Sequence, residues 1–420
     1  MAFRSHDAVI AWLNTFTDYE RQAHSKRAYT LSRMRRLIAA LGRPDRAMKC
    51  VHIAGTKGKG STAHMTESIL RAHGLKTGLY TSPHLVDLLE RIRIDGAPVS
   101  RREFVAVMNS MRPALDRLHP TFFETMTAAA FVAFKRARVG VAVIEVGLGG
   151  RLDATNVIEP AVCGVTRIDY DHVEKLGTTL SSIAFGKAGI IKPGVDVVTS
   201  EARPAALREI RRRGSPVVRV GRELRIENVR RAESMLRFTL KGARCGPLRP
   251  ALPVLGEHQA ENAAVAVGLA ERIAPLAPRR VAEGLRRLVL PGRVEIVSRR
   301  PLVVVDTAHN PFSARSTRAA LAPFEGRRWT VVFGASRDKD VRGMLKALVR
   351  RGDRWFVTAA RSPRAMAPGE LASLLKGAVP VGSVERAVKL AVKTARPRGL
   401  VLVTGSFYVA GEALHHVRQR

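Results

Sequence analysis

A short segment rich in glycine and lysine, GTKGKGS at residues 55–61, has the residue types of a phosphate-binding loop. Glycines let the backbone turn so that successive N–H groups point at phosphate oxygens, and the start of a following helix adds partial positive charge. Lys59 would reach the β- and γ-phosphates, and Ser61 is a candidate ligand of Mg²⁺ or phosphate. The spacing is shorter than the usual one, because two residues instead of four precede Gly58 and Gly60 intervenes before Ser61. An ordinary strand–helix turn is the alternative. We favour nucleotide binding, by Thr56, Lys57, Gly58, Lys59, Gly60 and Ser61.

A carboxylate and an imidazole stand at two further places where strands are expected to end. Glu145 lies near the end of the apolar run VGVAVIEVG, and burying a carboxylate is costly unless it is paired or binds a cation. His172 follows Asp171 just after the next apolar run, at the edge where open α/β sheets bind ligands. From the residues alone, Glu145 and His172 could form a structural ion pair or hold a metal ion.

The elements that must position these residues are short apolar runs alternating with helical patterns. Such near-continuous apolar runs are typical of parallel strands covered by helices on both faces. The predicted strands are residues 49–55, 139–147, 161–166 and 195–199, and the predicted helices are residues 59–73 and 101–118. This alternation predicts an α/β fold with a mostly parallel sheet.

The pattern changes in the second half of the chain. Basic residues are dense over residues 203–250, with two shorter strands expected at 217–220 and 236–240, and a helix expected at 258–273. After a Pro-Gly break at 291–292, a second α/β series is predicted, with strands at 302–306, 330–334, 355–358 and 400–405. We therefore expect an ATP-binding domain over residues 1–296 and a smaller Rossmann-like α/β domain over residues 297–420.

The composition narrows the class of protein. The 420 residues are 46% hydrophobic, which excludes a disordered or fibrous chain. Lys and Arg number 71 against 36 Asp and Glu, a formal charge of +35 that favours anionic partners. Three scattered cysteines do not form a disulfide framework or a CxxC metal motif, and we identify no signal peptide or membrane-length apolar run. We expect a cytoplasmic protein with no membrane partner.

Eleven short motifs in order resemble one family, the folylpolyglutamate synthase/dihydrofolate synthase family of the Mur ligase superfamily. They span nearly the whole chain: AGTKGKGS, YTSPHL, PTFFETMTAA, EVGLGGRLDATN, DH, KAGIIKPG, HQAENAA, PGRVE, DTAHNP, FGASRDKD and TGSFYVAG. Several of these motifs are weak alone, but their combination in this order is specific. The resemblance implies a Mur-type ATPase domain followed by a Rossmann-like ligase domain.

The resemblance also implies roles for single residues. Family positions that hold Mg²⁺ match Ser82, Glu145 and His172, which favours the metal over the ion pair. Lys187 matches a lysine that is typically carbamylated in Mur ligases and supports a second metal. Gly186 replaces the usual glutamate before that lysine, so a plain surface lysine is an equal alternative.

The remaining matches concern ATP, glutamate and the pterin substrate. Asn262, Arg293 and Asp306 match ATP contacts. These residue types suit that role, because the arginine guanidinium binds phosphate as a rigid fork, and the Asn and Asp side chains can bind the base and the ribose hydroxyls. His309 and Ser406 match positions near the incoming glutamate, with a loop histidine and a helix N-cap as alternatives. The pterin contacts are matched by Thr121, Phe122, Phe123, Glu124, Leu152, Asp153 and Ala154. Core packing is the alternative for the two phenylalanines.

The function that follows is an ATP- and Mg²⁺-dependent ligase that activates a carboxylate of dihydropteroate or a reduced folate as an acyl phosphate, which L-glutamate then attacks. The catalytic groups would be Lys59, Glu145, His172, Lys187 and His309. Two alternatives are another Mur-type ligase acting on a cell-wall precursor, against which PTFFE and LDAT speak, and a nucleic-acid-binding ATPase. Aromatic residues make up only 5% of the chain, which argues against base stacking and hence against a nucleic-acid partner. We expect a monomer with small-molecule substrates.

Overall fold

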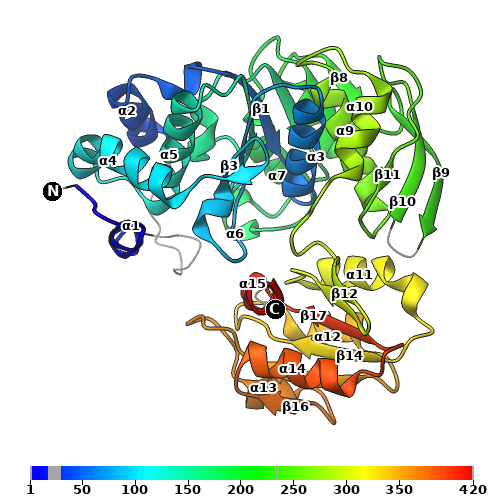
Figure 1. Ribbon diagram of the computed structural model, residues 1–420. Helices are drawn as coiled ribbons and strands as arrows, with labels where there is room; N and C mark the ends of the chain where they lie inside the picture. Colours follow the sequence, from blue (N-terminus) through cyan, green and yellow to red (C-terminus); the bar gives the residue numbers. More distant parts are fainter. Residues whose placement is uncertain (1, 18–29, 233–234, 419–420) are drawn as a thin grey trace.

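The strands of the first half assemble into one eight-stranded sheet in the order β4-β3-β2-β5-β1-β6-β7-β8. The computed structural model describes residues 2–17, 30–232 and 235–418 (Figure 1). The strands are β1 (Lys49–Ala54), β2 (Thr77–Tyr80), β3 (Ile92–Ile94), β4 (Ala97–Pro98), β5 (Val141–Glu145), β6 (Val162–Val165), β7 (Val197–Thr199) and β8 (Val217–Arg219). The central strand β1 pairs in parallel with β5 and β6, whereas β3 runs antiparallel to β2 and β4. The expectation of a mostly parallel sheet is confirmed.

Helices cover both faces of this sheet, which explains why its strands are apolar on both sides. The helices are α1 (His6–Leu13), α2 (Ser32–Ala40), α3 (Lys59–Ala72), α4 (Arg101–Leu118), α5 (Phe122–Arg136), α6 (Val173–Leu176), α7 (Leu180–Ala188), α8 (Pro204–Arg211), α9 (His258–Ala270) and α10 (Pro278–Arg286). Short 3₁₀ turns are η1 (Pro44–Arg46), η2 (Leu88–Arg91) and η3 (Ala154–Val157). One core lies between the sheet and α3, α9 and α10, and a second core lies on the opposite face under α4 and α5. The helix α4 begins with a Ser100–Glu103 capping box.

The basic region after β8 forms a separate small sheet. Its strands, β9 (Arg225–Ala232), β10 (Met235–Lys241) and β11 (Ala251–Leu252), are antiparallel in the order β11-β10-β9. The two short strands predicted at 217–220 and 236–240 belong to different sheets. The first is β8, which extends the large parallel sheet, and the second is β10, the central strand of the small sheet. Figure 1 shows the small sheet beside α9 and α10.

The second α/β series forms its own six-stranded sheet in the order β12-β13-β17-β14-β15-β16. Its strands are β12 (Glu295–Arg299), β13 (Leu302–Val305), β14 (Trp329–Phe333), β15 (Arg354–Thr358), β16 (Val379–Val381) and β17 (Leu400–Thr404). Its helices are α11 (Pro311–Ala320), α12 (Val341–Leu348), α13 (Pro368–Ser373), α14 (Val384–Thr394) and α15 (Phe407–Arg418), with a 3₁₀ turn η4 (Ala322–Phe324). Since β12 begins at Glu295, a domain boundary near residue 296 remains our proposal.

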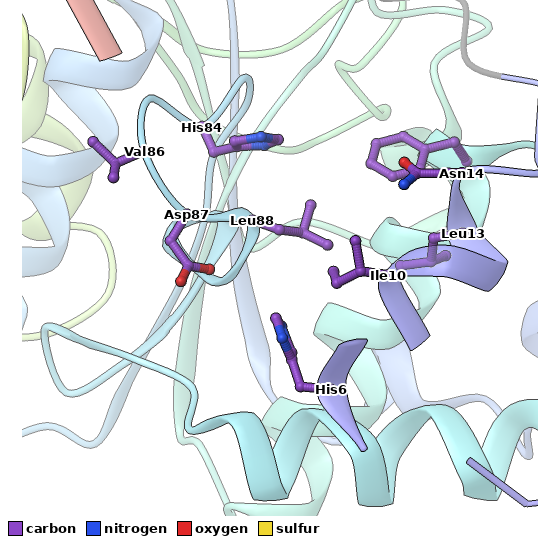
Figure 2. Close-up of a pocket in the computed structure, with 9 residues that line it drawn as sticks. His6, Ile10, Leu13, Asn14, His84, Val86, Asp87 and Leu88 are labelled. Atoms are coloured by element: carbon purple, nitrogen blue, oxygen red, sulfur yellow. The ribbon is translucent and has the colours of Figure 1, made fainter. Parts of the chain in front are cut away.

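The loop of residues 82–87, which follows β2 of the eight-stranded sheet, reaches the helices of the six-stranded sheet. Leu85 and Val86 pack against the apolar cluster under α14 and α15. A side chain at Gly411 of α15 would collide with the Leu85 carbonyl oxygen, so glycine permits this close approach. On its other side the loop borders a cavity of about 250 Å³ against α1. Figure 2 shows His84 and Leu88 across this cavity from Ile10 of α1.

Among the helices of the described ranges, we find none with the length and apolar character that crossing a bilayer requires.

Candidate active site between the two sheets

The phosphate loop follows β1, and α3 begins within it at Lys59, as the strand–loop–helix pattern predicts. Gly58 precedes the helix with φ of 88°, a left-handed conformation that glycine adopts without strain. A Cβ atom at Gly58 would collide with the amide oxygen of Asn262, so the loop packs directly against α9. A predicted ATP contact, Asn262, is thereby brought to the phosphate loop, and its Nδ2 donates to Gln259 at 2.9 Å.

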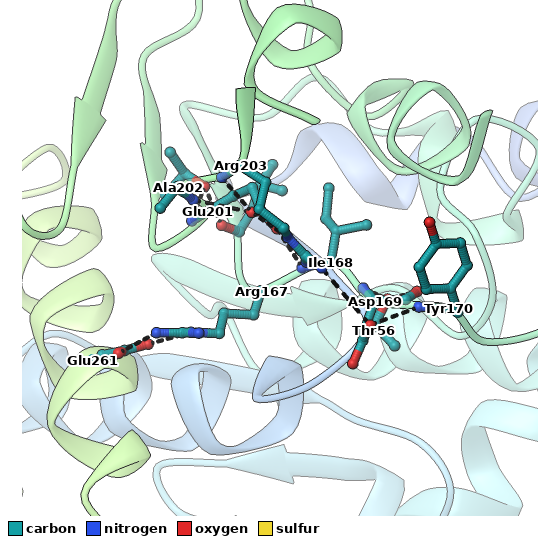
Figure 3. Close-up of polar contacts among 11 residues, drawn as sticks. Thr56, Arg167, Ile168, Asp169, Tyr170, Glu201, Ala202, Arg203 and Glu261 are labelled. Carbon is teal, nitrogen blue, oxygen red and sulfur yellow. Dashed lines mark hydrogen bonds and ion pairs between the residues drawn. The ribbon is translucent and has the colours of Figure 1, made fainter. Parts of the chain in front are cut away.

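The first two residues of the loop are fastened to the segment after β6. The amides of Thr56 and Lys57 donate to the Arg167 carbonyl at 2.9 and 3.2 Å. The Thr56 hydroxyl donates to the Asp169 carbonyl at 3.1 Å and accepts from the Asp169 amide at 2.9 Å (Figure 3). These two backbone amides already have acceptors, so the loop's contribution to a phosphate comes from Gly58 onward. Lys57 lies 3.8 Å from Asp171, and its pKa is lowered mainly by burial.

Ion pairs hold the same segment from two sides (Figure 3). Arg167 grips Glu261 of α9 through two guanidinium nitrogens, with its Nε at 2.6 Å from the carboxylate. Glu201 accepts from the Ile168 amide at 2.9 Å and from Arg203 at 3.0 Å. The segment that carries His172 is therefore tied to the phosphate loop, to α9 and to the end of β7.

Glu145 ends β5 beside the phosphate loop, where the register pairs it with Ile53. Its Oε2 accepts from the Ser82 amide at 3.1 Å, and both carboxylate oxygens would lie 3.4 Å from a Cβ at Gly60. The residue is only 5% exposed, and burial raises its pKa while the positive charge of Lys59 opposes that rise. Ser82 and Glu145, two of the three predicted metal ligands, are thus adjacent, and Gly60 of the phosphate loop lies directly beside the Glu145 carboxylate.

His172 stands at the start of α6 with φ of 50°, and it lines the same large cavity as Ser82. Its side chain is 43% exposed, and its pKa is lowered chiefly by partial removal from water, against the carboxylate of Asp171 at 3.8 Å. No group of three His, Cys, Asp or Glu side chains with metal-binding geometry occurs among the described residues. The predicted set has two such residues and one serine, which fits Mg²⁺, because Mg²⁺ takes few protein ligands and completes its shell with water and phosphate oxygens.

Lys187 is buried, with 4% of its surface exposed, so the surface-lysine alternative is wrong. Its Nζ donates to the Gly55 carbonyl at 2.9 Å, directly under the phosphate loop. Burial, assisted by the charge of Lys59, lowers its pKa to about 7. The neighbouring Gly186 lines the large cavity, and its carbonyl accepts from the Arg151 amide at 2.8 Å.

A cavity of about 1220 Å³ lies between the large parallel sheet and the six-stranded sheet, and Ser82, His172 and Gly186 line it. The phosphate loop, Glu145, Lys187 and the three predicted ATP contacts Asn262, Arg293 and Asp306 are not among its lining residues. Its walls come from the ends of β2 and β5, the start of α5, α6, and the loops after β14, β15 and β17. The predicted site residues that line it are Ser82, Thr121, Phe123, Glu124, Leu152, Asp153, Ala154, His172, His309 and Ser406. Phe122 does not line the cavity. Its ring packs in the core under α4 and α5, and the guanidinium of Arg91 lies 5.2 Å from the ring centroid.

At the α5 end of this cavity, part of the predicted pterin segment has structural partners. Thr121 and Glu124 form a capping box, and Glu124 Oε2 also accepts from Arg33 Nε at 2.7 Å. The Glu124 carboxylate is therefore held by α2 and by the α5 N-terminus. Phe123 is better placed to meet a flat ligand: it is partly exposed to the cavity, with the Tyr80 ring at 6.2 Å and Gly147 beneath it.

On the opposite wall, the second sheet contributes His309 and Ser406. His309 Nδ1 lies 3.0 Å from the Thr307 carbonyl, and its ring lies 5.2 Å from Phe407. Burial lowers its pKa to about 4, so Nε2 is an uncharged acceptor near neutral pH. The Ser406 hydroxyl accepts from the Val409 amide at 3.1 Å and so caps α15, as the N-cap alternative predicts. Ser406 also lines the cavity, so capping the helix does not remove it from the candidate site.

Arg293 and Asp306 lie together where the chain enters the second sheet. Arg293 Nη1 donates to the Thr307 hydroxyl at 2.7 Å, and its guanidinium lies 5.3 Å from the Phe407 ring. Asp306 accepts from the amides of Val294 and Ala308, both at 2.9 Å, and from a threonine hydroxyl of α11. Both Asp306 oxygens are therefore used to hold the loop after β13.

Sequence reasoning missed Arg91, the most deeply buried charge of the cavity wall. It is 1% exposed, and its Nε donates to His84 Nδ1 at 2.9 Å. Arg361 and Arg364, on the loop after β15, also line the cavity. The chain is rich in arginine, so residue type alone does not distinguish these three arginines from the others. Only for Arg91 does the sequence give a position, because the alternating motif ERIRI predicts a strand beside it.

Comparison with known proteins identifies the family. Residues 53–270 match the Mur ligase middle domain, and residues 292–407 match the Mur ligase, glutamate ligase domain. A probable bifunctional folylpolyglutamate synthase/dihydropteroate synthase of Halobacterium salinarum is 38% identical over 90% of this chain, which spans 48% of that longer protein. The dihydrofolate synthase/folylpolyglutamate synthase of Bacillus subtilis is 35% identical over 90% of this chain and 92% of its own length.

A solved structure supports the same relationship. The bifunctional folylpolyglutamate synthase/dihydrofolate synthase of Yersinia pestis, complexed with AMPPNP and a Mn ion, superposes with a TM-score of 0.87 at 30% identity. The match covers 100% of this chain and 99% of that one. The chain therefore belongs to the folylpolyglutamate synthase/dihydrofolate synthase family of Mur ligases.

Proposed function

We propose that this protein is an ATP-dependent ligase that joins L-glutamate to the carboxylate of a reduced folate and to that of dihydropteroate. The observation that carries the proposal is the large cavity, because one continuous space is bordered by the loops next to the phosphate loop, by the α5 segment and by His309 and Ser406. An acceptor carboxylate and an incoming amino acid can meet there, and the γ-phosphoryl group would reach them from the neighbouring phosphate loop.

The residues divide the chemistry between the two sheets. Lys59 and the loop amides from Gly58 onward would neutralise the γ-phosphoryl group as it passes to the acceptor carboxylate. The glutamate amine then attacks the acyl phosphate, and inorganic phosphate leaves. His309, uncharged at neutral pH because its pKa is lowered to about 4, would accept a hydrogen bond from the incoming amine, with Ser406 beside it. Closure of the two walls around the substrates would exclude water from the acyl phosphate.

We assign the metal to Ser82, Glu145 and His172. When bound, Mg²⁺ supplies positive charge that offsets the buried Glu145 carboxylate and the phosphate oxygens. A second site would require Lys187 as a carbamate. Its pKa of about 7 supports that modification, because only a neutral amine reacts with carbon dioxide. We assign the remaining ATP contacts to Asn262, Arg293 and Asp306.

One acceptor site would serve both substrates. We assign the pterin ring to Phe123 with the segments 121–124 and 152–154, which border the cavity on one side. Dihydropteroate ends in a rigid benzoate carboxylate and a folate ends in a flexible glutamyl chain, so the site must hold the ring at two distances from the phosphate. A cavity of about 1220 Å³ has room for both arrangements. We further propose a monomer acting in the cytoplasm, where the three free cysteines would remain reduced.

The test is ADP release by the purified protein with dihydropteroate or tetrahydrofolate, each with and without L-glutamate. We expect release that depends on both the acceptor and glutamate, and a product one glutamate longer by mass spectrometry. ADP release with no such dependence, or stimulated only by DNA, would overturn the proposal and favour a basic ATPase. If glutamate were added to tetrahydrofolate but not to dihydropteroate, the proposed dihydrofolate synthase activity would be wrong and the folylpolyglutamate synthase activity would remain.

A further inference from the structure

A buried hydrogen-bond chain connects the strand before the phosphate loop with the segment assigned to the pterin. His52, on β1, is completely buried, and its Nε2 lies 2.8 Å from the Thr155 hydroxyl oxygen. That hydroxyl donates to Asp153 Oδ1 at 2.6 Å. Thr155 is also completely buried, and Asp153 is 6% exposed at the cavity wall.

The partners fix which atom donates at each step. Burial raises the pKa of Asp153, and hydrogen bonds from Leu148 and Thr155 oppose that rise. Its Oδ1 accepts from the Thr155 amide at 3.0 Å and its Oδ2 accepts from the Leu148 amide at 2.8 Å, so both oxygens act as acceptors. Because the Thr155 hydroxyl has a single proton and gives it to Asp153, it can only accept from His52. His52 must therefore carry its proton on Nε2 and have an unprotonated Nδ1.

This imidazole is not explained by packing. Its neighbours on the same face of β1 are Cys50 and Ala54, which are apolar and fully buried, and a valine or isoleucine would suit such a strand. Within the described residues, His52 Nδ1 has no hydrogen-bond partner, and a buried polar atom without one lowers stability. Burial, together with the charge of Lys192, lowers the pKa of His52 to about 3, so the ring remains neutral and its donor direction does not change near neutral pH.

The chain ends on the two segments that form one wall of the cavity. Asp153 joins the loop at Leu148 to the turn η3, and β1 continues from His52 into the phosphate loop at Gly55. We propose that His52 is a positioning residue, which through Thr155 orients the Asp153 carboxylate and the 148–154 segment for the pterin substrate. This inference rests on the proposed function, because Asp153 is assigned to the pterin there.

The test compares substitutions that keep or remove the donor. In His52→Gln the side-chain amide can donate to Thr155 from about the position of Nε2, whereas His52→Leu cannot donate. We expect His52→Leu to raise KM for tetrahydrofolate and dihydropteroate by about tenfold or more, the value of one hydrogen bond in a charged network, with KM for ATP within about twofold. His52→Gln should restore most of the affinity for the pterin substrates. A purely structural role would lower thermal stability and change both KM values together.

A second pair of variants keeps the proposal testable if a His52 variant does not fold. Thr155→Val removes the hydroxyl with little change in shape, and Thr155→Ser retains it. Thr66→Val, which removes another buried hydroxyl whose partner is the Thr62 carbonyl within α3, is the matched control. We expect only Thr155→Val to raise KM for the pterin substrates.

The outcomes separate this inference from the proposed function. Wild-type protein that ligates glutamate establishes the function before any variant is compared, and wild-type protein without that activity overturns the function itself. The positioning role of His52 is then read independently by ¹⁵N NMR of histidine-labelled wild-type protein. We expect a neutral ring protonated at Nε2 that changes its chemical shift in Thr155→Val. A ring protonated at Nδ1, or unchanged KM values in both His52→Leu and Thr155→Val, would overturn the inference.

Discussion

Replacing Thr56 by valine should uncouple the phosphate loop from the segment that carries His172. The hydroxyl makes two hydrogen bonds with the backbone of Asp169, one donated at 3.1 Å and one accepted at 2.9 Å. Each is worth about 1 kcal/mol, so their loss should cost about 2 kcal/mol, or about 30-fold in rate if the loop must be fixed in the transition state. Valine keeps the shape, so the effect would come from the lost hydrogen bonds.

The assay is kcat/KM for ATP, measured as ADP release in the presence of tetrahydrofolate and glutamate. Thr56→Ser retains the hydroxyl and is the matched control, which we expect to keep activity near that of the wild type. Thermal unfolding of each variant distinguishes a local change from loss of the fold. A Thr56→Val variant within about twofold of the wild type, or an equally impaired Thr56→Ser variant, would contradict this role of the hydroxyl.

Four further predictions follow from the site. Lys59→Ala should lower kcat by about 10²–10³ in a protein that still folds, as judged by circular dichroism; near-normal turnover would remove the phosphate-loop assignment. Glu145→Gln should raise the Mg²⁺ concentration needed for half-maximal rate by about tenfold or more, whereas a lower melting temperature with unchanged Mg²⁺ dependence would indicate a structural ion pair. Because burial lowers the pKa of Lys187 to about 7, its amine is neutral above that pH and protonated below it. Activation by added bicarbonate should therefore diminish as the pH falls through about 7, and Lys187→Met should show no bicarbonate response at any pH; bicarbonate-independent wild-type activity would argue against the carbamate. Phe123→Ala should weaken dihydropteroate use by about tenfold and affect tetrahydrofolate less, as steady-state KM values for both would show, and equal losses would contradict a ring-stacking role.

The elements that position the phosphate loop could be predicted because their sequence pattern is local. The run before Gly55 is apolar throughout, as a central parallel strand requires, and α3 follows the glycines directly. Glu145 was identified for the same reason: a carboxylate at the end of an apolar strand needs a partner, which the Ser82 amide and the nearby charge of Lys59 provide.

Other features depend on contacts between distant residues and could not be predicted. The amides of Thr56 and Lys57 are occupied by the Arg167 carbonyl, which lies more than a hundred residues away in the chain. Adjacent residues also differ: Phe123 faces the cavity, whereas Phe122 is in the core, because successive positions on a helix point about 100° apart. Glu124 lines the cavity and also accepts from Arg33 on another helix, a pairing that the sequence pattern does not indicate.

The most direct test of the central claim follows oxygen from the acceptor to phosphate. Tetrahydrofolate labelled with ¹⁸O in its γ-carboxylate is incubated with the protein, ATP and L-glutamate, and the released phosphate is analysed by ³¹P NMR. Carboxylate activation as an acyl phosphate predicts one ¹⁸O in each phosphate released, in step with formation of the glutamate-extended product. Unlabelled phosphate would mean that water, and not the folate carboxylate, receives the phosphoryl group, and would contradict the account.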